Sequence, residues 1–322
     1  NAHGKRLNYK ATAGTLTVRN DGGMPTASLF YVAYTLDGQP LGSRPITYMF
    51  NGGPGSPSIW LHMGAFGPVR VLTDDPVVER PAPFRMGPND MTLLDKTDLV
   101  FIDMVGAGYS RPLGEGTGAV HWGVDGDVDT FARAILRYTT KFNRWSSPKY
   151  ILGESYGTLR AGALAYQLED RGMSLNGTIL LSSIMNYGVR QPGFPQNFVS
   201  LLPTYAATAW YHNAIPNRDS ITLEQHVQRA REFAGGVYTS ALNKGHDISD
   251  QEKAEVARQM SALIGIDPAF IEQANLRLEL SPFRKELLRD RRQTVGRLDS
   301  RYTGIDFSQI TSSPEEDPSS SA

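Results

Sequence analysis

The chain has no cysteine among its 322 residues. Disulfide bonds and thiol chemistry are therefore excluded, and cysteine usage cannot indicate the compartment in which the protein works. The chain also has no excess of charge of either sign, because 33 acidic residues balance 32 basic ones and leave a net charge of −1. A protein with this balance has no general electrostatic attraction to nucleic acid or to an anionic membrane.

Long apolar runs are lacking too. No stretch of the sequence approaches the roughly 18 residues that a membrane-spanning helix needs. No charged and then apolar leader opens the chain, which begins at Asn1 rather than at Met, so the alternative of a leader already removed stays open. With 40% hydrophobic residues, the chain has enough apolar side chains for a substantial core. The sequence has no internal repeat, heptad pattern or metal-ligand cluster. We therefore expect a soluble globular protein that uses no metal or organic cofactor.

One short motif indicates a nucleophile. Residues 153–157 read Gly-Glu-Ser-Tyr-Gly and lie between a strand-like run, residues 150–152, and a helix-forming run, residues 159–168. A G-x-S-x-G sequence at a strand-to-helix turn is typical of a nucleophile elbow. Glycines are needed on both sides because side chains beside the strained serine would collide with the following helix. Ser155 is therefore the candidate nucleophile, with an ordinary surface turn as the alternative.

A second glycine-rich segment follows a predicted strand at residues 45–50. Residues 51–58 read Asn-Gly-Gly-Pro-Gly-Ser-Pro-Ser, and a loop of this composition exposes backbone N–H groups. An acyl-transfer enzyme uses such donors to stabilise the oxyanion of its tetrahedral intermediate. One donor comes from a loop of this kind and one from the residue after the nucleophile, here Tyr156. The alternatives are a tight turn or a phosphate-binding loop, but no Gly-Lys-Ser or Gly-Lys-Thr follows.

With a third segment, these motifs resemble a known family. Residues 98–103 (Asp-Leu-Val-Phe-Ile-Asp) lead into residues 106–110 (Gly-Ala-Gly-Tyr-Ser), between the glycine-rich segment and the elbow. The three motifs in this order are similar to those of the serine carboxypeptidases. The resemblance is strong over residues 45–185, and residues 289–301 resemble the bacterial branch of that family.

The resemblance implies an α/β-hydrolase fold and a role for each motif residue. Ser155 would be the acylating nucleophile, and Gly53 and Tyr156 would donate the two hydrogen bonds to the oxyanion. Asp103 stands at the end of a predicted strand, where it resembles a catalytic acid. It precedes the serine, against the order of the hydrolase triad, so we predict that it supports a loop.

The same resemblance implies a site for the free carboxylate of a peptide substrate. Asn51, the backbone of Gly52 and the side chain of Glu154 would bind it. A carboxyl group binds another carboxylate only when the two share one proton, so this contact would strengthen at acid pH. A structural carboxylate is the alternative interpretation of Glu154.

Three positions depart from the family pattern. Ser56 stands where the loop usually has a cysteine, Ala65 where a second carboxylate-binding glutamate is expected, and Met49 where an aromatic residue is usual. These departures bear on the recognition of a free C-terminus and on an acid optimum. They leave the nucleophile and the loop unchanged.

The sequence offers no clear candidate for the histidine base. In this fold the catalytic acid and histidine follow the serine along the chain, and only three of the six histidines do so: His212, His226 and His246. We predict packing or a helix end for the first, a solvated helix face for the second and a loop for the third, and none suits a base. The C-terminal strands, with the catalytic Asp and His, are therefore expected to be missing from this chain, as in a fragment or in one chain of a processed pair with a companion chain.

The pattern along the chain predicts three parts. Residues 1–185 would form the N-terminal part of an α/β-hydrolase core with a mixed sheet, residues 186–301 an inserted helical cap, and residues 302–322 a linker leading back to the core. The predicted strands of the core are residues 7–19, 27–36, 46–50, 99–103, 150–152 and 178–182. Helices over residues 127–141 and 158–168 separate the last three strands and favour parallel pairing.

The cap shows apolar residues at helical spacing. Its predicted helices are residues 197–212, 222–234, 251–264, 269–274 and 282–297. Ser249, Asp267 and Ser281 are the predicted N-caps, and the charged run 284–292 is predicted to be a solvated face. A cap of this kind would restrict access to the active site and shape substrate specificity.

The sequence thus predicts a serine-type carboxypeptidase that releases C-terminal residues from peptides through an acyl-Ser155 intermediate. Its partner would be a peptide with a free C-terminus, and we expect no nucleic-acid or membrane partner. Two alternatives stay open, namely an esterase or acyltransferase that uses the same serine, and a non-catalytic peptide-binding module. The resemblance to the bacterial branch favours a secreted or periplasmic protein. If the C-terminal strands are missing, an exposed sheet edge and unburied apolar surface are expected.

Overall fold

The computed structural model describes residues 4–40, 42–73, 82–114, 118–191, 193–308 and 310–321. The chain divides into two compact units. The first consists of Asn1–Leu72 with Phe84–Met185, and the second of Thr73–Pro83 with Asn186–Ala322. Each unit has its own hydrophobic core and is described by itself.

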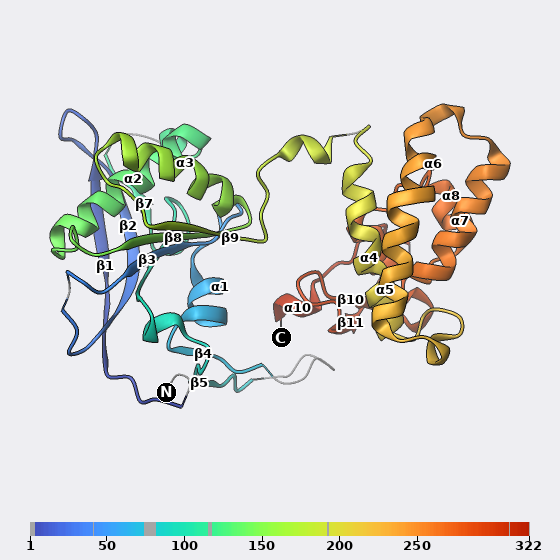
Figure 1. Ribbon diagram of the computed structural model, residues 1–322, viewed down its shortest axis with the longest axis horizontal. Coiled ribbons are helices and arrows are strands. Elements are labelled where there is room, and N and C mark those ends of the chain that lie inside the picture. The colour runs from blue at the N-terminus through green and yellow to red at the C-terminus, as the bar shows by residue number, and fades with distance from the viewer. Residues whose placement is uncertain are drawn as a thin grey trace. The chain divides into compact units, whose positions relative to one another are not determined.

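The first unit is built on a mixed sheet with the strand order β1-β2-β6-β3-β8-β9 (Figure 1). Its β1 and β2 pair antiparallel, as do β2 and β6, whereas β6, β3, β8 and β9 run parallel. A short β7 pairs with β2 outside this order. The bounds are β1 (Tyr9–Arg19), β2 (Pro25–Leu36), β3 (Ile46–Phe50), β6 (Asp98–Ile102), β7 (Arg111–Pro112), β8 (Lys149–Glu154) and β9 (Gly177–Leu181).

All six strands predicted for this unit are present, and all of their ends lie within two residues of the predicted ones. The parallel direction of the last three is also correct. The order of the strands in the sheet differs from their order along the chain, however, because β3 lies between β6 and β8 and pairs with both. The carboxyl ends of β3, β6 and β8 therefore lie at one end of the sheet, where ligands bind in open α/β folds.

The two faces of the sheet have separate cores. Figure 1 shows α2 (Val124–Lys141) and α3 (Tyr156–Asp170) together on one face, where Tyr48 and Phe131 belong to the larger cluster. Met49 and Phe101 belong to a smaller cluster on the other face. Because successive side chains of a strand point to opposite faces, β3 and β6 read as continuous apolar runs. Every residue of these two strands is buried.

Short elements follow the strands of this unit. They are α1 (Ile59–Leu61), the π-helical η1 (His62–Phe66), η2 (Leu93–Asp95), η3 (Gly118–His121), and the two strands β4 (Val69–Val71) and β5 (Met86–Pro88), which pair with each other.

The edge strand β9 is exposed among the residues that the structure describes. It pairs with β8 alone, and Ile179 and Leu180, which point to opposite faces, are each 43% exposed. The sequence led us to expect an exposed edge with unburied apolar surface only if the C-terminal strands are missing, and β9 is an edge of this kind among the described residues. An apolar strand that is exposed on both faces is a site for further pairing or aggregation.

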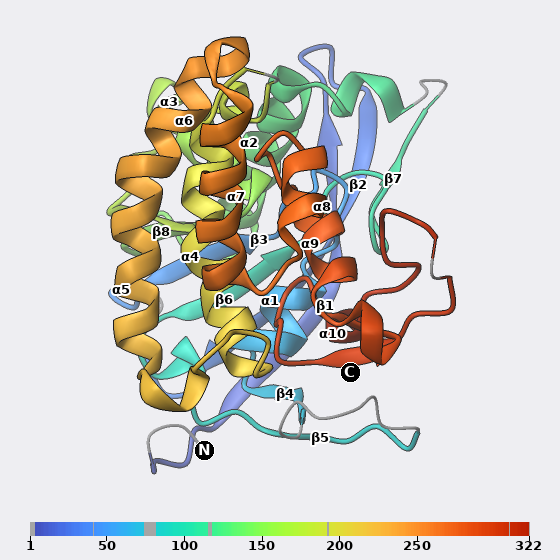
Figure 2. The ribbon, with the colours of Figure 1, turned by 90° about the vertical axis from the view of Figure 1, so that its right-hand side faces the viewer.

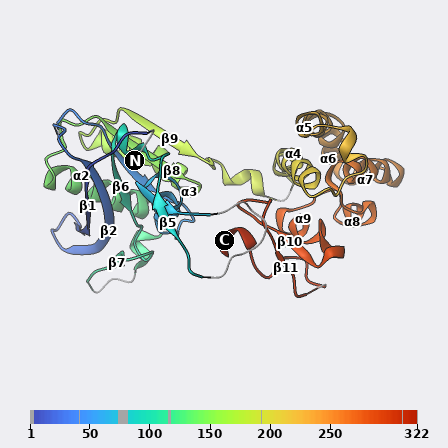
Figure 3. The same cartoon turned by 90° about the horizontal axis from the view of Figure 1, so that it is seen from below.

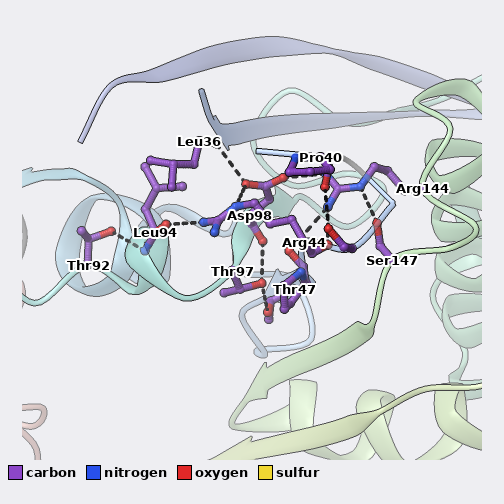
Figure 4. Close-up of polar contacts among 12 residues, drawn as sticks. Leu36, Pro40, Arg44, Thr47, Thr92, Leu94, Thr97, Asp98, Arg144 and Ser147 are labelled. Carbon is purple, nitrogen blue, oxygen red and sulfur yellow. Dashed lines mark hydrogen bonds and ion pairs between the residues drawn. The ribbon is translucent and has the colours of Figure 1, made fainter. Parts of the chain in front are cut away.

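A buried charge network closes the end of the sheet where β3, β6 and β8 begin (Figure 4). Its centre is Asp98, the first residue of β6, which is 1% exposed. Asp98 forms ion pairs with Arg44 Nε at 2.7 Å and with Arg144 Nη1 at 2.6 Å, and its Oδ1 accepts a hydrogen bond from the backbone of Leu36. Arg144 also donates to Ser147 Oγ. The network joins four segments of the chain at the end opposite the carboxyl ends of the strands.

The second unit is largely helical, and Figure 2 shows its helices in front. Figure 3 looks along several of them, and α4 packs against both α5 and α7. The bounds are η4 (Tyr187–Arg190), α4 (Gln196–Tyr211), η5 (Arg218–Ser220), α5 (Leu223–Phe233), the π-helical η6 (Ala234–Tyr238), α6 (Thr239–Lys244), η7 (Gly245–Asp247), α7 (Asp250–Ile264), α8 (Pro268–Gln273), α9 (Leu280–Glu286), η8 (Arg289–Arg291), β10 (Gln293–Val295), β11 (Thr303–Ile305) and α10 (Pro318–Ser321).

Two of the three predicted N-caps in this unit are correct. Ser249 accepts a hydrogen bond from the backbone of Glu252, and Asp267 accepts one from Ala269. Ser281 is not a cap, because α9 begins at Leu280, one residue before it. The helix predicted over residues 282–297 is also too long, since α9 ends at Glu286 and the chain continues through η8 into β10.

The solvated face predicted for residues 284–292 is wrong for two of its cations. Arg284 and Lys285 are buried, and Lys285 is only 1% exposed. Arg284 Nε donates to the carbonyl of Val295, and Lys285 Nζ forms an ion pair with Asp306 at 2.5 Å. The segment predicted as a linker, residues 302–322, thus contributes β11 and a buried carboxylate. The reason is that the chain after α9 returns as the antiparallel pair β10–β11 and covers these side chains.

His226 is likewise buried rather than solvated. It is 4% exposed, and its Nε2 is hydrogen-bonded to the carbonyl of Leu263 at 2.9 Å, which joins α5 to α7. His212 ends α4, as predicted, and its Nε2 contacts the carbonyl of Ser300 at 2.7 Å. His246 lies exposed in η7. Within the described residues of the second unit, the rings of His212 and His226 therefore tie elements together.

Candidate active site

The turn that carries Ser155 is as short as a strand-to-helix connection can be. The strand β8 ends at Glu154 and α3 begins at Tyr156, so Ser155 alone joins them. Its backbone has φ 57° and ψ −124°. A side-chain-bearing residue in such a region costs on the order of 1–3 kcal/mol and persists only where the surroundings impose it.

Hydrogen bonds on both sides hold this strained residue. The Ser155 N–H donates to the carbonyl of Leu181 in β9 at 3.0 Å. The Ser155 carbonyl accepts from the backbone N–H of Thr158 at 2.9 Å and from its hydroxyl at 2.7 Å. The same hydroxyl accepts from the N–H of Ile184. The elbow is thus fixed to the neighbouring strand and to the first turn of α3.

The glycines of the motif are required by close contacts, as the sequence predicted. A Cβ on Gly153 would lie 1.9 Å from the carbonyl oxygen of Gly157, in the first turn of α3. A Cβ on Gly157 would lie 3.0 Å from the carbonyl oxygen of Phe50, at the end of β3. No side chain fits at the first position, and the second allows the helix to approach β3 closely.

The segment of residues 51–58, here called the glycine loop, packs directly against the elbow. A Cβ on Gly52 would lie 2.5 Å from the backbone nitrogen of Tyr156 and 2.6 Å from the carbonyl oxygen of Glu154. Gly53 has φ +107°, a conformation that favours glycine. The loop also turns back on itself, since Ser56 N donates to the Gly52 carbonyl at 3.0 Å. The backbone of the loop and that of the elbow are therefore in contact at Gly52.

Asn51 links the glycine loop to the elbow through its side chain. Its Nδ2 donates to Glu154 Oε2 at 3.0 Å, and its Oδ1 accepts from the backbone of Leu61 in α1 at 3.2 Å. Asn51 is buried, while Glu154 and Ser155 are half-buried. The structure thus brings all six predicted site residues into one region: Asn51, Gly52, Gly53, Glu154, Ser155 and Tyr156.

Asp103 supports loops, as predicted. Its Oδ1 accepts from both the backbone N–H and the hydroxyl of Ser58, at 2.8 and 2.7 Å. Its Oδ2 lies 3.4 Å from the backbone nitrogen of Tyr109. The carboxylate therefore joins the end of the glycine loop to the loop that follows β6.

A second buried group next to the site has no counterpart in the sequence prediction. Arg160 of α3 donates through Nε to Asp127 Oδ2 at 2.7 Å and through Nη1 to the carbonyl of Asn51 at 2.9 Å. Tyr156 also hydrogen-bonds to Asp127. Burial raises the pKa of the Asp127 carboxyl, against the opposing effect of the Arg160 charge. The helical spacing of Tyr156, Arg160 and Leu164 puts the arginine on the apolar side of α3. This spacing was the signal in the sequence that could have identified Arg160 as a buried residue.

Both described histidines of the first unit are engaged away from Ser155. The Nε2 of His62 lies 2.7 Å from the hydroxyl of Tyr34, and its ring stacks on Phe101. Burial lowers the pKa of His62, and the nearby charge of Asp103 opposes this shift. His121 contacts Thr130 Oγ1 and the Thr26 carbonyl through its two ring nitrogens. Within the described ranges, no hydrogen bond joins Ser155 Oγ to another residue, and His3 lies outside those ranges.

The strained serine, the glycine loop and the sheet agree with a known family of hydrolases. The sequence profile of that family, described as "Serine carboxypeptidase", matches residues 3–305. The chain belongs to the serine carboxypeptidase family. Its fold is the α/β-hydrolase fold, with a mixed sheet and covering helices. No curated protein sequence matches the chain.

Several solved structures are similar to this member of the serine carboxypeptidases. Kex1(Δ)p, a prohormone-processing carboxypeptidase from Saccharomyces cerevisiae, is 19% identical with a TM-score of 0.46, and the match covers 80% of this chain and 53% of that one. The 2-hydroxy-6-oxo-6-phenylhexa-2,4-dienoate hydrolase from Rhodococcus sp. strain RHA1 is 11% identical, with a TM-score of 0.37 and coverage of 87% and 79%. The peroxisomal α/β-hydrolase Lpx1 from Saccharomyces cerevisiae is 15% identical, with a TM-score of 0.31 and coverage of 62% and 52%.

The chain thus spans about half the length of the yeast carboxypeptidase that it matches. None of these matches supports the companion chain that was one expectation from the sequence. Within the described ranges, every helix is too short or too polar to serve as a membrane span.

The three departures from the carboxypeptidase pattern take structural roles in this chain. Met49 is fully buried in the core on the second face of the sheet. The carbonyl of Ala65 accepts a hydrogen bond of 2.6 Å from Asn89 Nδ2. The hydroxyl of Ser56 contacts the carbonyl of Pro57 at 3.3 Å. None of the three side chains adds a carboxyl or thiol group next to the glycine loop.

Proposed function

We propose that the protein is a serine carboxypeptidase that removes C-terminal residues from peptides through an acyl-Ser155 intermediate. The observation that carries the proposal is the contact between the strained elbow and the glycine loop, with the pair Asn51 and Glu154 beside it. Membership of the serine carboxypeptidase family supports the same reaction.

In the proposed acylation step, Ser155 Oγ forms a bond to the carbonyl carbon of the last peptide bond. Its proton passes to a histidine base, and the carbonyl oxygen becomes an oxyanion. The backbone N–H groups of Gly53 and Tyr156 would donate to that oxyanion, and the loss of one such donor costs about 3–4 kcal/mol of barrier. The C–N bond then breaks, and the amine leaves with the proton from the histidine. Water attacks the acyl-enzyme in the same way and restores Ser155.

The free carboxylate of the substrate would bind to Asn51, Gly52 and Glu154. Asn51 Nδ2 is a donor, and it is already directed at Glu154 Oε2. A substrate carboxylate next to Glu154 requires one proton between the two acids, because two like charges at this distance repel. We therefore infer that the substrate binds with a shared proton and that peptides with an amidated C-terminus bind poorly.

Neither described histidine of the first unit is placed to act as the base. His62 and His121 are hydrogen-bonded to other groups and do not contact Ser155. A serine hydroxyl without a base is a weak nucleophile. The proposal therefore requires a histidine other than these two, oriented by an acid.

The test uses the protein as expressed from its full-length gene. Release of C-terminal amino acids is measured from one peptide with a free C-terminus and from the same peptide with a C-terminal amide. We expect release from the first only, and none from either with Ser155→Ala. Equal rates for the two peptides, or faster cleavage of simple esters, would favour an esterase. Normal turnover by the alanine variant would rule out the acyl-Ser155 intermediate.

We further propose that the protein acts outside the cytoplasm, in the periplasm or medium. The support is the resemblance of the chain to the bacterial branch of the family. Cell fractionation with an antibody against the protein tests this, and recovery in the cytoplasmic fraction alone would contradict it.

A further inference from the structure

We propose that Arg160 is a positioning residue for the reaction, because its guanidinium fixes the start of the glycine loop against the elbow. The inference rests on the proposed function and adds a residue to its machinery. Arg160 does not touch the substrate in this proposal. It acts through the two segments that would supply the oxyanion donors.

The contacts of Arg160 reach both of those segments. Its side chain is 0% exposed. Nη1 donates to the carbonyl of Asn51, the first residue of the glycine loop, at 2.9 Å. Nε forms an ion pair with Asp127 at 2.7 Å, and Asp127 in turn holds Tyr156, the residue after the nucleophile. One ion pair therefore connects the sources of both proposed donors.

Aromatic rings surround the same guanidinium. Its Cζ lies 4.2 Å from the ring centroid of Phe131, 5.2 Å from that of Phe50 and 5.3 Å from that of Tyr156. Phe50 directly precedes the glycine loop, and Phe131 belongs to α2. A planar cation held between rings has little freedom to move. The Asn51 carbonyl is thus bound to a fixed point in the core.

The position of Asn51 matters because the backbone at the next residue, Gly52, is packed tightly against the elbow. Gly52 is so close to Tyr156 N and to the Glu154 carbonyl that a single added carbon would overlap with both. A shift of Asn51 would therefore move Gly53 relative to the elbow. Misplacement of a catalytic group by about 1 Å costs on the order of a hundredfold in rate.

A role in stability alone explains the arrangement less well. Arg160 Nη2 is buried and has no hydrogen-bond partner among the described residues. Buried ion pairs are weak sources of stability compared with well-packed apolar side chains, and an unpaired buried donor is a further cost. The apolar surroundings of Phe50 and Phe131 would accept a methionine. The carbonyl of Asn51 and the carboxylate of Asp127 require a cation with two directed donors.

The test measures the reactivity of Ser155 independently of peptide recognition. A fluorophosphonate probe is attacked at phosphorus by Ser155 Oγ, the serine proton passes to the base, and fluoride leaves. The phosphoryl oxygen would occupy the oxyanion position. The second-order labelling rate is measured on the intact protein for wild type, Arg160→Met and Arg160→Lys, at temperatures where each is folded.

The matched control is Arg144→Met. Arg144 also forms a buried ion pair, with Asp98 at 2.6 Å, but at the opposite end of the sheet (Figure 4). Both methionine variants are expected to lower the urea midpoint of unfolding. Only Arg160→Met should slow labelling, by roughly ten- to a hundredfold, and Arg160→Lys should fall between it and wild type. Arg144→Met should label within about twofold of wild type, because a buried pair far from the oxyanion donors affects folding and not their alignment.

Labelling of folded Arg160→Met at the wild-type rate would overturn the proposal. If Arg160→Met does not fold, Asp127→Asn serves instead. It keeps the shape of the Asp127 side chain, removes the carboxylate charge, and should also slow labelling. An unchanged rate in that variant would equally overturn it. Wild-type protein that is labelled at Ser155 but releases no C-terminal residues would reject the carboxypeptidase function alone. A wild-type Ser155 that does not react at all would reject the positioning role as well.

Discussion

The side-chain amide of Asn51 donates a hydrogen bond to Oε2 of Glu154 at 3.0 Å. The two residues come from the carboxyl ends of the neighbouring strands β3 and β8, and Glu154 directly precedes Ser155. The bond therefore joins the glycine loop to the elbow on the side where a substrate carboxylate would bind. An amide donor next to a carboxyl group can bind a substrate carboxylate. The amide donates one hydrogen bond to it, and the carboxyl group shares a proton with it.

Asn51→Ala should weaken the binding of free C-termini without impairing the nucleophile. A hydrogen bond to a charged group contributes about 1.5–3 kcal/mol, so the KM for a peptide with a free C-terminus should rise by roughly ten- to a hundredfold. The kcat for an ester without a carboxylate should change little. Steady-state kinetics with both substrates checks this, and an equal loss on the ester would place Asn51 in the chemistry instead.

Glu154→Gln should remove the acid dependence of substrate binding. The amide has the shape of the acid but cannot share a proton with a substrate carboxylate. In wild type, the KM for free C-termini is expected to fall as the pH is lowered, because the shared proton becomes available. In the variant, the KM should depend much less on pH between 4 and 7. A profile parallel to that of wild type would mean that another group carries the proton.

Gly52→Ala should disrupt the alignment of the proposed oxyanion donors. The added carbon would lie 2.5 Å from the backbone nitrogen of Tyr156, and backbone atoms cannot move aside as a side chain does. We expect a loss of roughly a hundred- to a thousandfold in kcat. Gly55→Ala is the control from the same loop, because a Cβ there meets no atom within 4 Å. Similar activity of the two variants, measured on folded protein, would contradict the contact at Gly52.

The parts of this structure that depend on local pattern could be predicted from the sequence. The strands β3 and β6 are buried on both faces, so their apolar runs identify them directly. Gly153 and Ser155 could be placed for a similar reason, since the elbow needs a glycine where its Cβ would meet the next helical turn. The pattern that identifies these elements lies within residues close in sequence, even where distant segments fix their geometry.

The parts that depend on distant segments could not be predicted. Lys285 belongs to a charged run with helical spacing, and its burial arises only when β11 and Asp306 return over α9. His226 stands among polar neighbours in sequence, yet its ring meets the carbonyl of Leu263 in α7. Arg160 lay on the apolar side of a predicted helix, but its partner Asp127 comes from another helix. In each case a polar group is buried because a distant segment supplies its partner.

Ser155→Gly should be more stable than Ser155→Ala, although we expect neither variant to be active. Ser155 has φ 57° and ψ −124°, a conformation that costs a side-chain-bearing residue on the order of 1–3 kcal/mol and that glycine adopts freely. Alanine retains this strain. Part of the gain is offset because glycine also raises the conformational entropy of the unfolded chain. We therefore expect a net difference of about 1 kcal/mol in the free energy of unfolding. Urea titration of the two variants measures it, and equal stabilities would mean that the elbow holds no strain.

His62 should make the fold less stable as the pH is lowered from 7 towards 5. Burial lowers the pKa of its imidazole from the usual 6.5, against the opposing charge of Asp103. The ring is hydrogen-bonded to the Tyr34 hydroxyl and stacks on Phe101. Below pH 6.5 the unfolded chain takes up a proton on this histidine before the folded chain does, so protonation favours unfolding until the pH falls below the folded-state pKa. His62→Gln keeps a polar group for the Tyr34 hydroxyl and has no titrating ring. The free energy of unfolding of this variant, followed by urea titration at several pH values, should therefore decline less steeply than that of wild type below pH 6.5. A slope identical to that of wild type would show that the burial of His62 contributes nothing to the acid sensitivity of the fold.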